Sequence, residues 1–263
     1  MTQENLTVNK SLKVSKKEIL DDFLLMNVSR NISYIGRKEV FMGRAKFGVF
    51  GDGKELPQIA MSKFFRNGDF RSGYYRDQTF MMSINQLTPD QFFAQLYAHT
   101  DIKKDPHSGG RQMNCHFGTR LLNENGDWKT QTDMMNSVSD ISCVSGQMPR
   151  IVGLAYASKL YRNNKNLSDM ENFSINGNEV VFGTIGDAST SEGHFGKQLM
   201  RVVSCKFHLL CQYGMMDTEF LSHLNIILQE MICLKLFQVF KDHLKKKMDM
   251  KFLQFMLGTT LIY

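Results

Sequence analysis

The chain has 263 residues and a hydrophobic content of 42%, enough for one large α/β domain or two smaller ones with a sizeable core. Its formal net charge of +6 is mild and its charged residues are mixed in sign, which disfavours a nucleic-acid partner. Five scattered cysteines, a polar N-terminus without a secretory signal and no apolar run of about 18 residues predict a cytoplasmic protein without a membrane partner.

The first hundred residues are expected to form three helices, over 13–30, 56–65 and 91–100. Residues 1–12 are interpreted as a flexible arm before them. The glycines between 36 and 53 indicate turns and short extended pieces. Pro57 suits the first turn of the second helix. Thr88 as N-cap and Pro89 as first helical residue predict where the third helix begins.

The next part of the chain is expected to contain a long helix and a strand. Residues 101–136 are rich in loops, and 163–178 form a turn region before an apolar strand at 180–185. The helix is predicted over 146–161. It carries small residues of the kind that pack closely against a neighbour: Gly153, Ala155, Ala157 and Ser158.

Gly48, Gly53 and Lys54 nearly match a phosphate-binding loop. The next residue is Glu55 rather than Ser or Thr, so the hydroxyl that holds magnesium is missing and a carboxylate would repel the phosphates. The segment is therefore predicted to be a glycine turn before a helix.

The run VVFGTIGDASTSEGHF at 180–195 joins a β-rich segment to a turn and small polar residues. The apolar segment ends in Gly186 and Asp187, and Ala188 and Ser189 open toward a helix. In an open α/β sheet this order presents a loop to a phosphate group. Asp187, at the carboxyl end of the strand, adds a hard oxygen ligand for the divalent cation that a diphosphate needs.

Two further segments carry groups suited to such a ligand. Tyr75 and Arg76 place a phenol beside a planar bidentate cation, and both can bind phosphate oxygens. Ser142 and Val144 precede the predicted long helix, where a backbone turn could hold a heterocycle. Taken alone, a Tyr-Arg pair on a loop is more often surface packing, and the GGRQM segment with His116 is equally weak. These segments are informative because of their order along the chain before residues 180–195.

Four segments in the same order resemble the thiamine-diphosphate-dependent 2-oxoacid dehydrogenases: RSGYYRDQTFMM, GGRQMNCHFG, ISCVSGQMPRIVGLAYASK and VVFGTIGDASTSEGHF. The resemblance covers roughly residues 19–195. It is nearest to the alpha-type part of the decarboxylating first component, of the pyruvate and branched-chain 2-oxoisovalerate type. It implies an α/β fold that binds thiamine diphosphate, present as a fragment with an incomplete parallel sheet and surrounding helices. Residues 13–195 would form this domain.

The resemblance implies roles for the residues that match the family's motifs. Tyr75 and Arg76 match residues that contact the diphosphate of the cofactor. Ser142 and the backbone at Val144 match contacts on the aminopyrimidine side. The diphosphate–magnesium turn is matched by Gly186, Asp187, Ala188 and Ser189, with Asp187 as a ligand of Mg²⁺. No catalytic residue is assigned.

The implied function is the oxidative decarboxylation of a 2-oxo acid, with transfer of the acyl group to a lipoyl carrier. The cofactor supplies the electron sink, and the protein orients it. The implied partners are the beta-type half of the same component, separate or fused, and a lipoyl-bearing acyltransferase. In this family the glutamate that activates the aminopyrimidine lies on the beta-type half, so the chain alone is expected not to turn over.

The resemblance stops after Phe195. The family continues with W-E-T-x-N-A and a second metal-ligating Asn or Asp, whereas this chain has Met216 at the nearest matching position and Asp217 beside it. A thioether is a poor ligand for magnesium. Restoring one thymine at the codons of Phe195 and Gly196 lets permissible codons read out the family-like sequence WETINACCKLQVPFVMSVWDDGYGISVP. Residues 196–263 are therefore predicted to be out of frame, through a mutation or a sequencing error.

Two functional hypotheses arise from this prediction. The chain is either a cofactor-binding dehydrogenase component or an inactive truncated product of a frameshifted gene. Without the family's later strands, the strand at 180–185 is expected to lie exposed at a sheet edge. A basic nucleic-acid-binding module built on the tail, and a zinc site, are weaker alternatives that an out-of-frame origin makes accidental. The zinc ligands would be Cys205, His208, Cys211 and Cys233.

Overall fold

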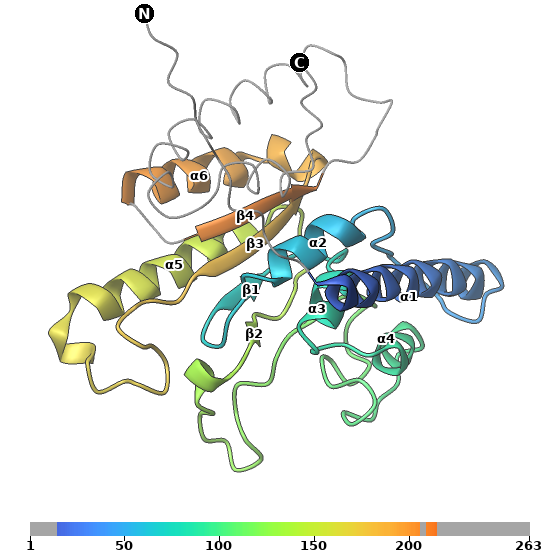
Figure 1. Ribbon diagram of the computed structural model, residues 1–263, viewed down its shortest axis with the longest axis horizontal. Coiled ribbons are helices and arrows are strands. Elements are labelled where there is room, and N and C mark those ends of the chain that lie inside the picture. Colours follow the sequence, from blue (N-terminus) through green and yellow to red (C-terminus); the bar gives the residue numbers. More distant parts are fainter. Residues whose placement is uncertain (1–14, 206–208, 215–263) are drawn as a thin grey trace, which may run out of the picture.

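The computed structural model describes residues 15–205 and 209–214. Within that part of the chain, parallel strands form one open sheet in the order β2-β1-β3-β4 (Figure 1). The strands are β1 Phe70–Ser72, β2 Asn136–Ser137, β3 Val181–Gly186 and β4 Leu209–Gly214. This sheet confirms the predicted fold class. The predicted arm at 1–12 lies outside the described residues.

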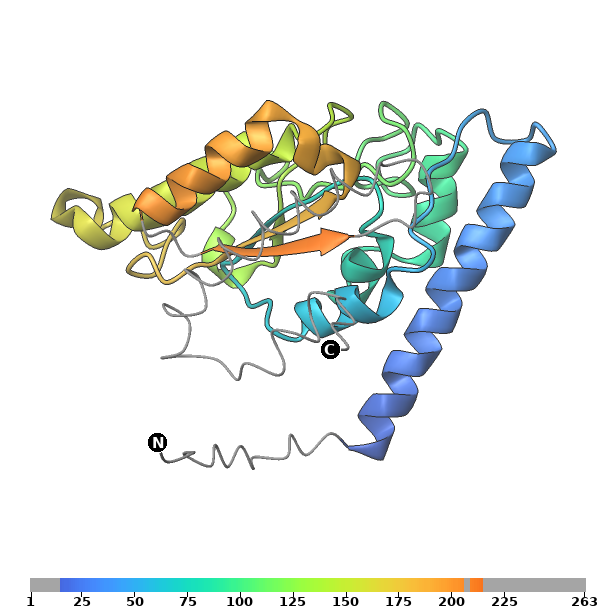
Figure 2. The same ribbon diagram turned by 90° about the horizontal axis from the view of Figure 1, so that it is seen from above.

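Helices cover both faces of the sheet. They are α1 Lys16–Phe41, α2 Glu55–Ser62, α3 Gln78–Ser83, α4 Pro89–Leu96, α5 Gln147–Asn163 and α6 Gly193–Cys205. As parallel strands require, the connections are crossovers, with α5 between β2 and β3 and α6 between β3 and β4. Both of these helices lie on one side of the sheet, α2 and α3 lie on the other, and the long α1 stands at the margin (Figures 1 and 2).

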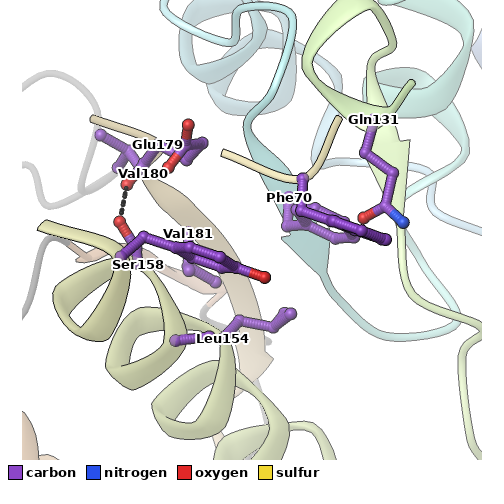
Figure 3. Close-up of a pocket in the computed structure, with 10 residues that line it drawn as sticks. Phe70, Gln131, Leu154, Ser158, Glu179, Val180 and Val181 are labelled. Carbon is purple, nitrogen blue, oxygen red and sulfur yellow. Dashed lines mark hydrogen bonds between the residues drawn. The ribbon is translucent and has the colours of Figure 1, made fainter. Parts of the chain in front are cut away.

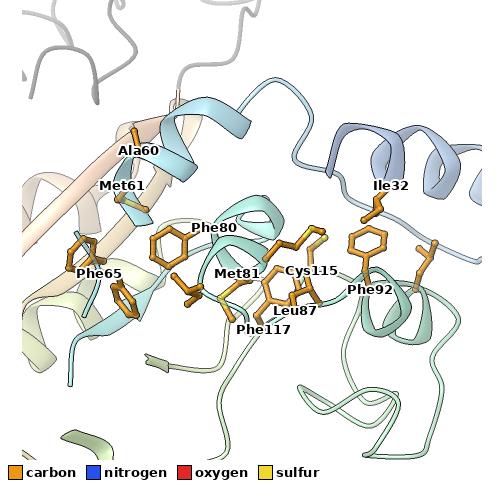
Figure 4. Packing of buried hydrophobic residues seen from close by; sticks show 14 of the residues in the cluster. Ile32, Ala60, Met61, Phe65, Phe80, Met81, Leu87, Phe92, Cys115 and Phe117 are labelled. Carbon is orange, nitrogen blue, oxygen red and sulfur yellow. The ribbon is translucent and has the colours of Figure 1, made fainter. Parts of the chain in front are cut away.

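Strand β3 is the centre of the core because both of its faces are buried. Val181 and Ile185 pack with Met148 and Ile151 of α5. Phe182 points the other way, into the cluster formed by α2, α3 and α4, part of which Figure 4 shows. Such a strand has a continuous apolar run in its sequence, which makes it recognisable without a structure.

The prediction that this strand lies at an exposed edge is wrong. β3 pairs with β1 on one side and with all six residues of β4 on the other, from Val181↔Leu209 to Gly186↔Gly214. The prediction failed because residues 209–214, beyond the family resemblance, form a strand. Strand β4 ends at Gly214. Met216 and Asp217 lie outside the described residues.

Helix α1 is longer than predicted. It continues to Phe41 and passes through Gly36, which was expected in a turn. A Cβ at Gly36 would overlap the ring of Phe50, and a Cβ at Gly48 would lie 2.5 Å from the same ring. A glycine inside a helix costs about 1 kcal/mol relative to alanine. Here these glycines make room for an aromatic side chain, so tertiary packing explains them better than turn formation.

The predicted start of α4 is confirmed, whereas its end is not. The Thr88 hydroxyl accepts from Gln91 N and the Gln91 side chain accepts from Thr88 N, which makes a capping box, with Pro89 at the first helical position. The helix ends at Leu96 rather than near residue 100. Ala98 then adopts a left-handed φ of 53°, which an α-helix does not allow.

Helices α2 and α5 lie close to their predictions. Helix α2 ends at Ser62, three residues early, and α5 continues to Asn163. The prediction that small residues on α5 face a neighbour holds for Ala155 and Ser158, which are buried. It is wrong for Gly153, which is exposed and would have nothing within 4 Å of a Cβ.

Candidate functional site

The predicted site residues lie at one edge of the sheet. All strands are parallel, so the loops after β1, β2 and β3 leave from the same side, here named the carboxyl edge. The loop after β1 carries Tyr75 and Arg76, the loop after β2 leads to Ser142 and Val144, and the loop after β3 begins at Asp187. The carboxyl edge of an open α/β sheet is where ligands bind in this class of fold.

The turn after β3 has the predicted order of glycine, carboxylate and small residues. Asp187 already has helical φ and ψ of −57° and −51°, and a 3₁₀ turn, Ala188–Ser191, comes next. A Cβ at Gly186 would lie 3.5 Å from the Tyr74 ring and 3.8 Å from Ser189 Oγ, so these groups flank the glycine. The Asp187 side chain is buried at 9% exposure and has no ion pair among residues 15–205 and 209–214.

The turn after β1 brings aromatic and cationic groups beside this loop. The rings of Tyr74 and Tyr75 lie 5.2 Å apart, and the Arg76 guanidinium lies 5.5 Å from the centre of the Tyr75 ring. The Tyr74 hydroxyl is buried and has no hydrogen-bond partner in the described part of the chain. Burial raises the pKa of Tyr74, and the carboxylate of Asp77 adds to the effect. The sequence pointed to Tyr75 and Arg76 but gave no signal for Tyr74.

Lys54, which the sequence presented only as part of the rejected phosphate-loop motif, is a second group near the site that was not predicted to belong to it. Gln58 Nε2 donates to the Arg76 carbonyl at 2.8 Å, and the backbone of Gly51 contacts the same carbonyl, so the turn before α2 packs on the β1 turn. Burial lowers the pKa of Lys54, the nearby Arg76 lowers it further, and Asp187 acts in the opposite direction. The Lys54 ammonium therefore lies within electrostatic reach of the site.

The dismissal of a phosphate-binding loop at this turn is consistent with the structure. The Glu55 carboxylate is turned back onto its own loop, where it accepts from Gly53 N at 3.0 Å. It also pairs with Arg30 at 2.5 Å. The predicted glycine turn before a helix is confirmed.

A buried ion triad holds the site loops together. Arg71, on the three-residue strand β1, is fully buried and donates to Asp77 at 2.7 and 2.9 Å and to Asp140 at 2.9 and 3.1 Å. The Thr184 hydroxyl of β3 also bonds Asp77. Burial opposes the charge on Arg71, but Asp140 and Asp77 outweigh it and raise the pKa of Arg71. The loops after β1 and β2 are thereby fixed to each other and to β3.

The segment of Ser142 and Val144 is anchored from behind. Both residues are exposed, but Gln147 at the start of α5 donates to the Thr184 carbonyl at 3.0 Å. Ser142 Oγ lies 2.8 Å from Nε2 of His116, whose ring is buried. In the sequence His116 is only a weak signal, and its position behind Ser142 is what shows its relevance.

The described residues contain no cluster of three or more His, Cys, Asp or Glu side chains that could hold a metal ion by themselves. Asp187 is the predicted ligand in the described part of the site. Magnesium commonly takes one or two carboxylates and completes its shell with water and substrate phosphates. The predicted zinc alternative depends on His208 and Cys233, which lie outside the described residues.

A small cavity of about 140 Å³ lies at the opposite edge of the sheet, where the strands begin. It lies between Leu154 and Ser158 of α5 and Phe70 and Gln131 (Figure 3). It is therefore separate from the loops at the carboxyl edge. None of the predicted site residues lines it.

The fold and the site define an α/β protein whose predicted phosphate-binding residues lie on loops at the carboxyl edge of an open parallel sheet. The chain belongs to the family of dehydrogenase E1 components, whose model matches residues 25–200. It is similar to the 2-oxoisovalerate dehydrogenase subunit alpha of Bacillus subtilis (strain 168), with 26% identity over 188 residues, covering 71% of this chain and 48% of that protein. The mitochondrial 2-oxoisovalerate dehydrogenase subunit alpha of Caenorhabditis elegans is 24% identical over 187 residues, covering 71% of this chain and 36% of that protein.

The chain thus spans about half or less of these relatives. The family assignment predicted from the sequence is confirmed. Separately, none of the helices in the described part of the chain is long and apolar enough to cross a membrane.

Proposed function

We propose that the chain is the alpha-type part of a decarboxylating 2-oxoacid dehydrogenase component and binds thiamine diphosphate with Mg²⁺ at the carboxyl edge. The observation that carries the proposal is the convergence of three loops. The Gly186–Ser189 turn with its buried carboxylate lies beside the Tyr75–Arg76 turn, and the Ser142–Val144 segment is tied to the same strand.

The residues present fit a diphosphate. The buried Tyr74 hydroxyl, which has no partner among the described residues, is a donor available to an anion. Gly186 leaves open the space that a Cβ would fill between the Tyr74 ring and Ser189. Arg76 and Lys54 supply positive charge on the same side. The Asp187 carboxylate supplies a hard oxygen for Mg²⁺.

Each predicted residue then has a role in binding or orientation. Tyr75 and Arg76 hold the diphosphate, together with Gly186, Ala188 and Ser189, and Asp187 holds the cation. The Ser142 hydroxyl and the backbone of Val144 contact the aminopyrimidine. When bound, thiamine diphosphate supplies the electron sink for decarboxylation of a 2-oxo acid.

The complete assembly is an oxidoreductase. In it, the acyl group that remains after decarboxylation passes to a lipoyl-bearing acyltransferase. A beta-type half of the same component, separate or fused, completes the active site, so this chain alone does not turn over. The free thiols of Cys115 and Cys143 support a reducing, cytoplasmic location. No nucleic-acid or membrane partner is part of the proposal.

The second candidate is an inactive product of a frameshifted gene that no longer binds the cofactor productively. The observation that favours it is the loss of family-like sequence after Phe195, where one restored thymine yields a family-like continuation. Domain 196–263 would then be foreign to the family sequence, although its residues 209–214 form β4 beside β3. Nucleotide sequence across codons 190–200 tests this directly, because a gene in which no one-base shift gives the family continuation excludes it.

Calorimetric titration of the full chain with thiamine diphosphate, with and without Mg²⁺, separates the two candidates. The first predicts micromolar, magnesium-dependent binding. Asp187→Asn should weaken that binding by about 10- to 100-fold and remove most of its dependence on magnesium. Asp169→Asn, at an exposed aspartate, is the matched control and should bind like the wild type. The absence of binding by the wild-type chain would refute the first candidate.

A further inference from the structure

Ser142 carries an exposed hydroxyl with a buried imidazole behind it. His116 is only 3% exposed, and its Nε2 lies 2.8 Å from Ser142 Oγ. Ser142 itself faces solvent at the carboxyl edge. Its hydroxyl is thus held from the inside and offers its remaining bonding capacity to a ligand on the outside.

The protonation pattern of His116 is set by its partners. His116 Nδ1 lies 3.2 Å from the carbonyl oxygen of Asn114, and a carbonyl oxygen only accepts, so Nδ1 carries a proton. In the neutral imidazole, Nε2 is then an acceptor. This tautomer is assigned from the hydrogen-bond network.

The surroundings keep this ring in place. Asn114 makes two hydrogen bonds to the backbone of Val49, at 3.0 and 2.7 Å. Gln95 Nε2 donates to the His116 carbonyl at 2.8 Å. The backbone that positions the imidazole is therefore fixed on both sides.

The Ser142 hydroxyl has one proton, and His116 Nε2 accepts it. The outward-facing lone pairs of Ser142 Oγ can then only accept. We propose that His116 is a positioning residue that makes Ser142 an acceptor-only contact. The site therefore prefers a pyrimidine with an amino group, whose N–H can donate to Ser142 Oγ. It disfavours the same pyrimidine with an oxo group in that position, which can only accept. This inference rests on the proposed function, because it concerns the ring of the proposed cofactor.

Nuclear magnetic resonance of histidine tests the inference without a ligand. In ¹⁵N-histidine-labelled chain at about pH 8, where an ordinary imidazole is neutral, the His116 proton should reside on Nδ1. Ser142→Ala should shift the Nε2 resonance, because it removes the hydrogen bond, and should leave the tautomer unchanged. A proton on Nε2 in the wild-type chain would overturn the inference.

Ligand binding tests the selectivity. The full chain with Mg²⁺ is titrated with thiamine diphosphate and with its 4-oxo analogue, oxythiamine diphosphate. The wild type should prefer the amino form by at least about tenfold, the factor expected when one hydrogen bond is replaced by two facing acceptors. His116→Phe frees the hydroxyl to rotate and donate, so the preference should fall toward unity.

Ser142→Ala, at an exposed position, should also remove the preference, and His116→Phe should change nothing further in that background. His99→Phe, at an exposed histidine, is the control and should keep the wild-type preference. Equal affinity of the wild type for both ligands would overturn the inference and leave the proposed function standing. Failure to bind either ligand would overturn both, whatever the tautomer.

Discussion

The buried triad of Arg71, Asp77 and Asp140 offers the sharpest test of how the site loops are held. Arg71→Met keeps an unbranched apolar stem and removes the guanidinium with its charge, so two buried carboxylates are left without their cation. Breaking a buried ion pair costs about 3–5 kcal/mol, because a charge stays in the interior without compensation. That cost is a large fraction of the roughly 5–15 kcal/mol by which a domain is stable.

Urea unfolding provides the assay. With a slope of about 2 kcal/mol per molar urea, the loss corresponds to a fall in the midpoint of about 1.5–2.5 M. Arg37→Met is the matched control, because Arg37 pairs with Asp52 at 2.6 Å while its side chain is 40% exposed. An exposed pair contributes about 0–1 kcal/mol, so this midpoint should move by less than about 0.5 M.

Two further variants test whether charge imbalance is the cause. Asp140→Asn leaves a balanced pair between Arg71 and Asp77 and should cost less than Arg71→Met, about 1–3 kcal/mol. Adding Asp77→Asn and Asp140→Asn to Arg71→Met removes every charge and should restore much of the lost stability. Equal effects of Arg71→Met and Arg37→Met, or no recovery in the triple variant, would refute the reasoning.

The structure fixes the direction of the effect of four other substitutions. Gly36→Ala should lower the urea midpoint because its Cβ overlaps Phe50. Gly153→Ala, at an open helical position, should raise the free energy of unfolding by about 0.5–1 kcal/mol. If both substitutions shift the urea midpoint in the same direction, this reasoning is contradicted. Gly73→Ala should weaken binding of thiamine diphosphate in calorimetry, since its Cβ overlaps the carboxylate of Asp77, and unchanged affinity would count against that packing. Burial lowers the pKa of His107. As the pH falls through about 6.5, the ordinary pKa of histidine, the unfolded chain therefore takes up a proton at His107 more readily than the folded chain does. The stability that is present above that pH is lost as the pH falls. His107→Leu should therefore flatten the decline in urea midpoint between about pH 7 and 5, and an unchanged slope would speak against this assignment.

The sequence predicted those parts of the fold and site whose signals are local. The start of α4 is predictable because Thr88 caps a helix and Pro89 suits its first position. Strand β3 and the turn after it are predictable from an apolar run that ends in Gly186 and Asp187. Because parallel strands end at one edge, locating the β3 turn also locates the partner loops. The candidate residues Tyr75, Arg76, Ser142 and Val144 lie on these loops.

The features that escaped prediction depend on contacts between distant residues. The extent of α1 depends on Phe50, which reaches Gly36 only in the folded chain. Strand β1 has three residues and includes a charged one, so neither length nor alternation marks it, and its arginine is buried only because Asp140 is brought to it. Lys54 was set aside when the phosphate-loop motif was rejected. Its position near Arg76 and Asp187 is visible only in the folded chain.

The two functional candidates differ over residues 196–263 rather than over the loops of the site. The ion triad, the His116–Ser142 bond and the Gln147–Thr184 bond all lie between residues 71 and 184, before the position at which the family resemblance stops. Whether residues 196–263 are native or foreign, these contacts preorganise one side of the site. A foreign tail would therefore remove the second metal ligand and spare the diphosphate contacts. Magnesium dependence of binding is then a more discriminating measurement than binding itself, since weak binding that ignores magnesium is the result that a half-formed site predicts.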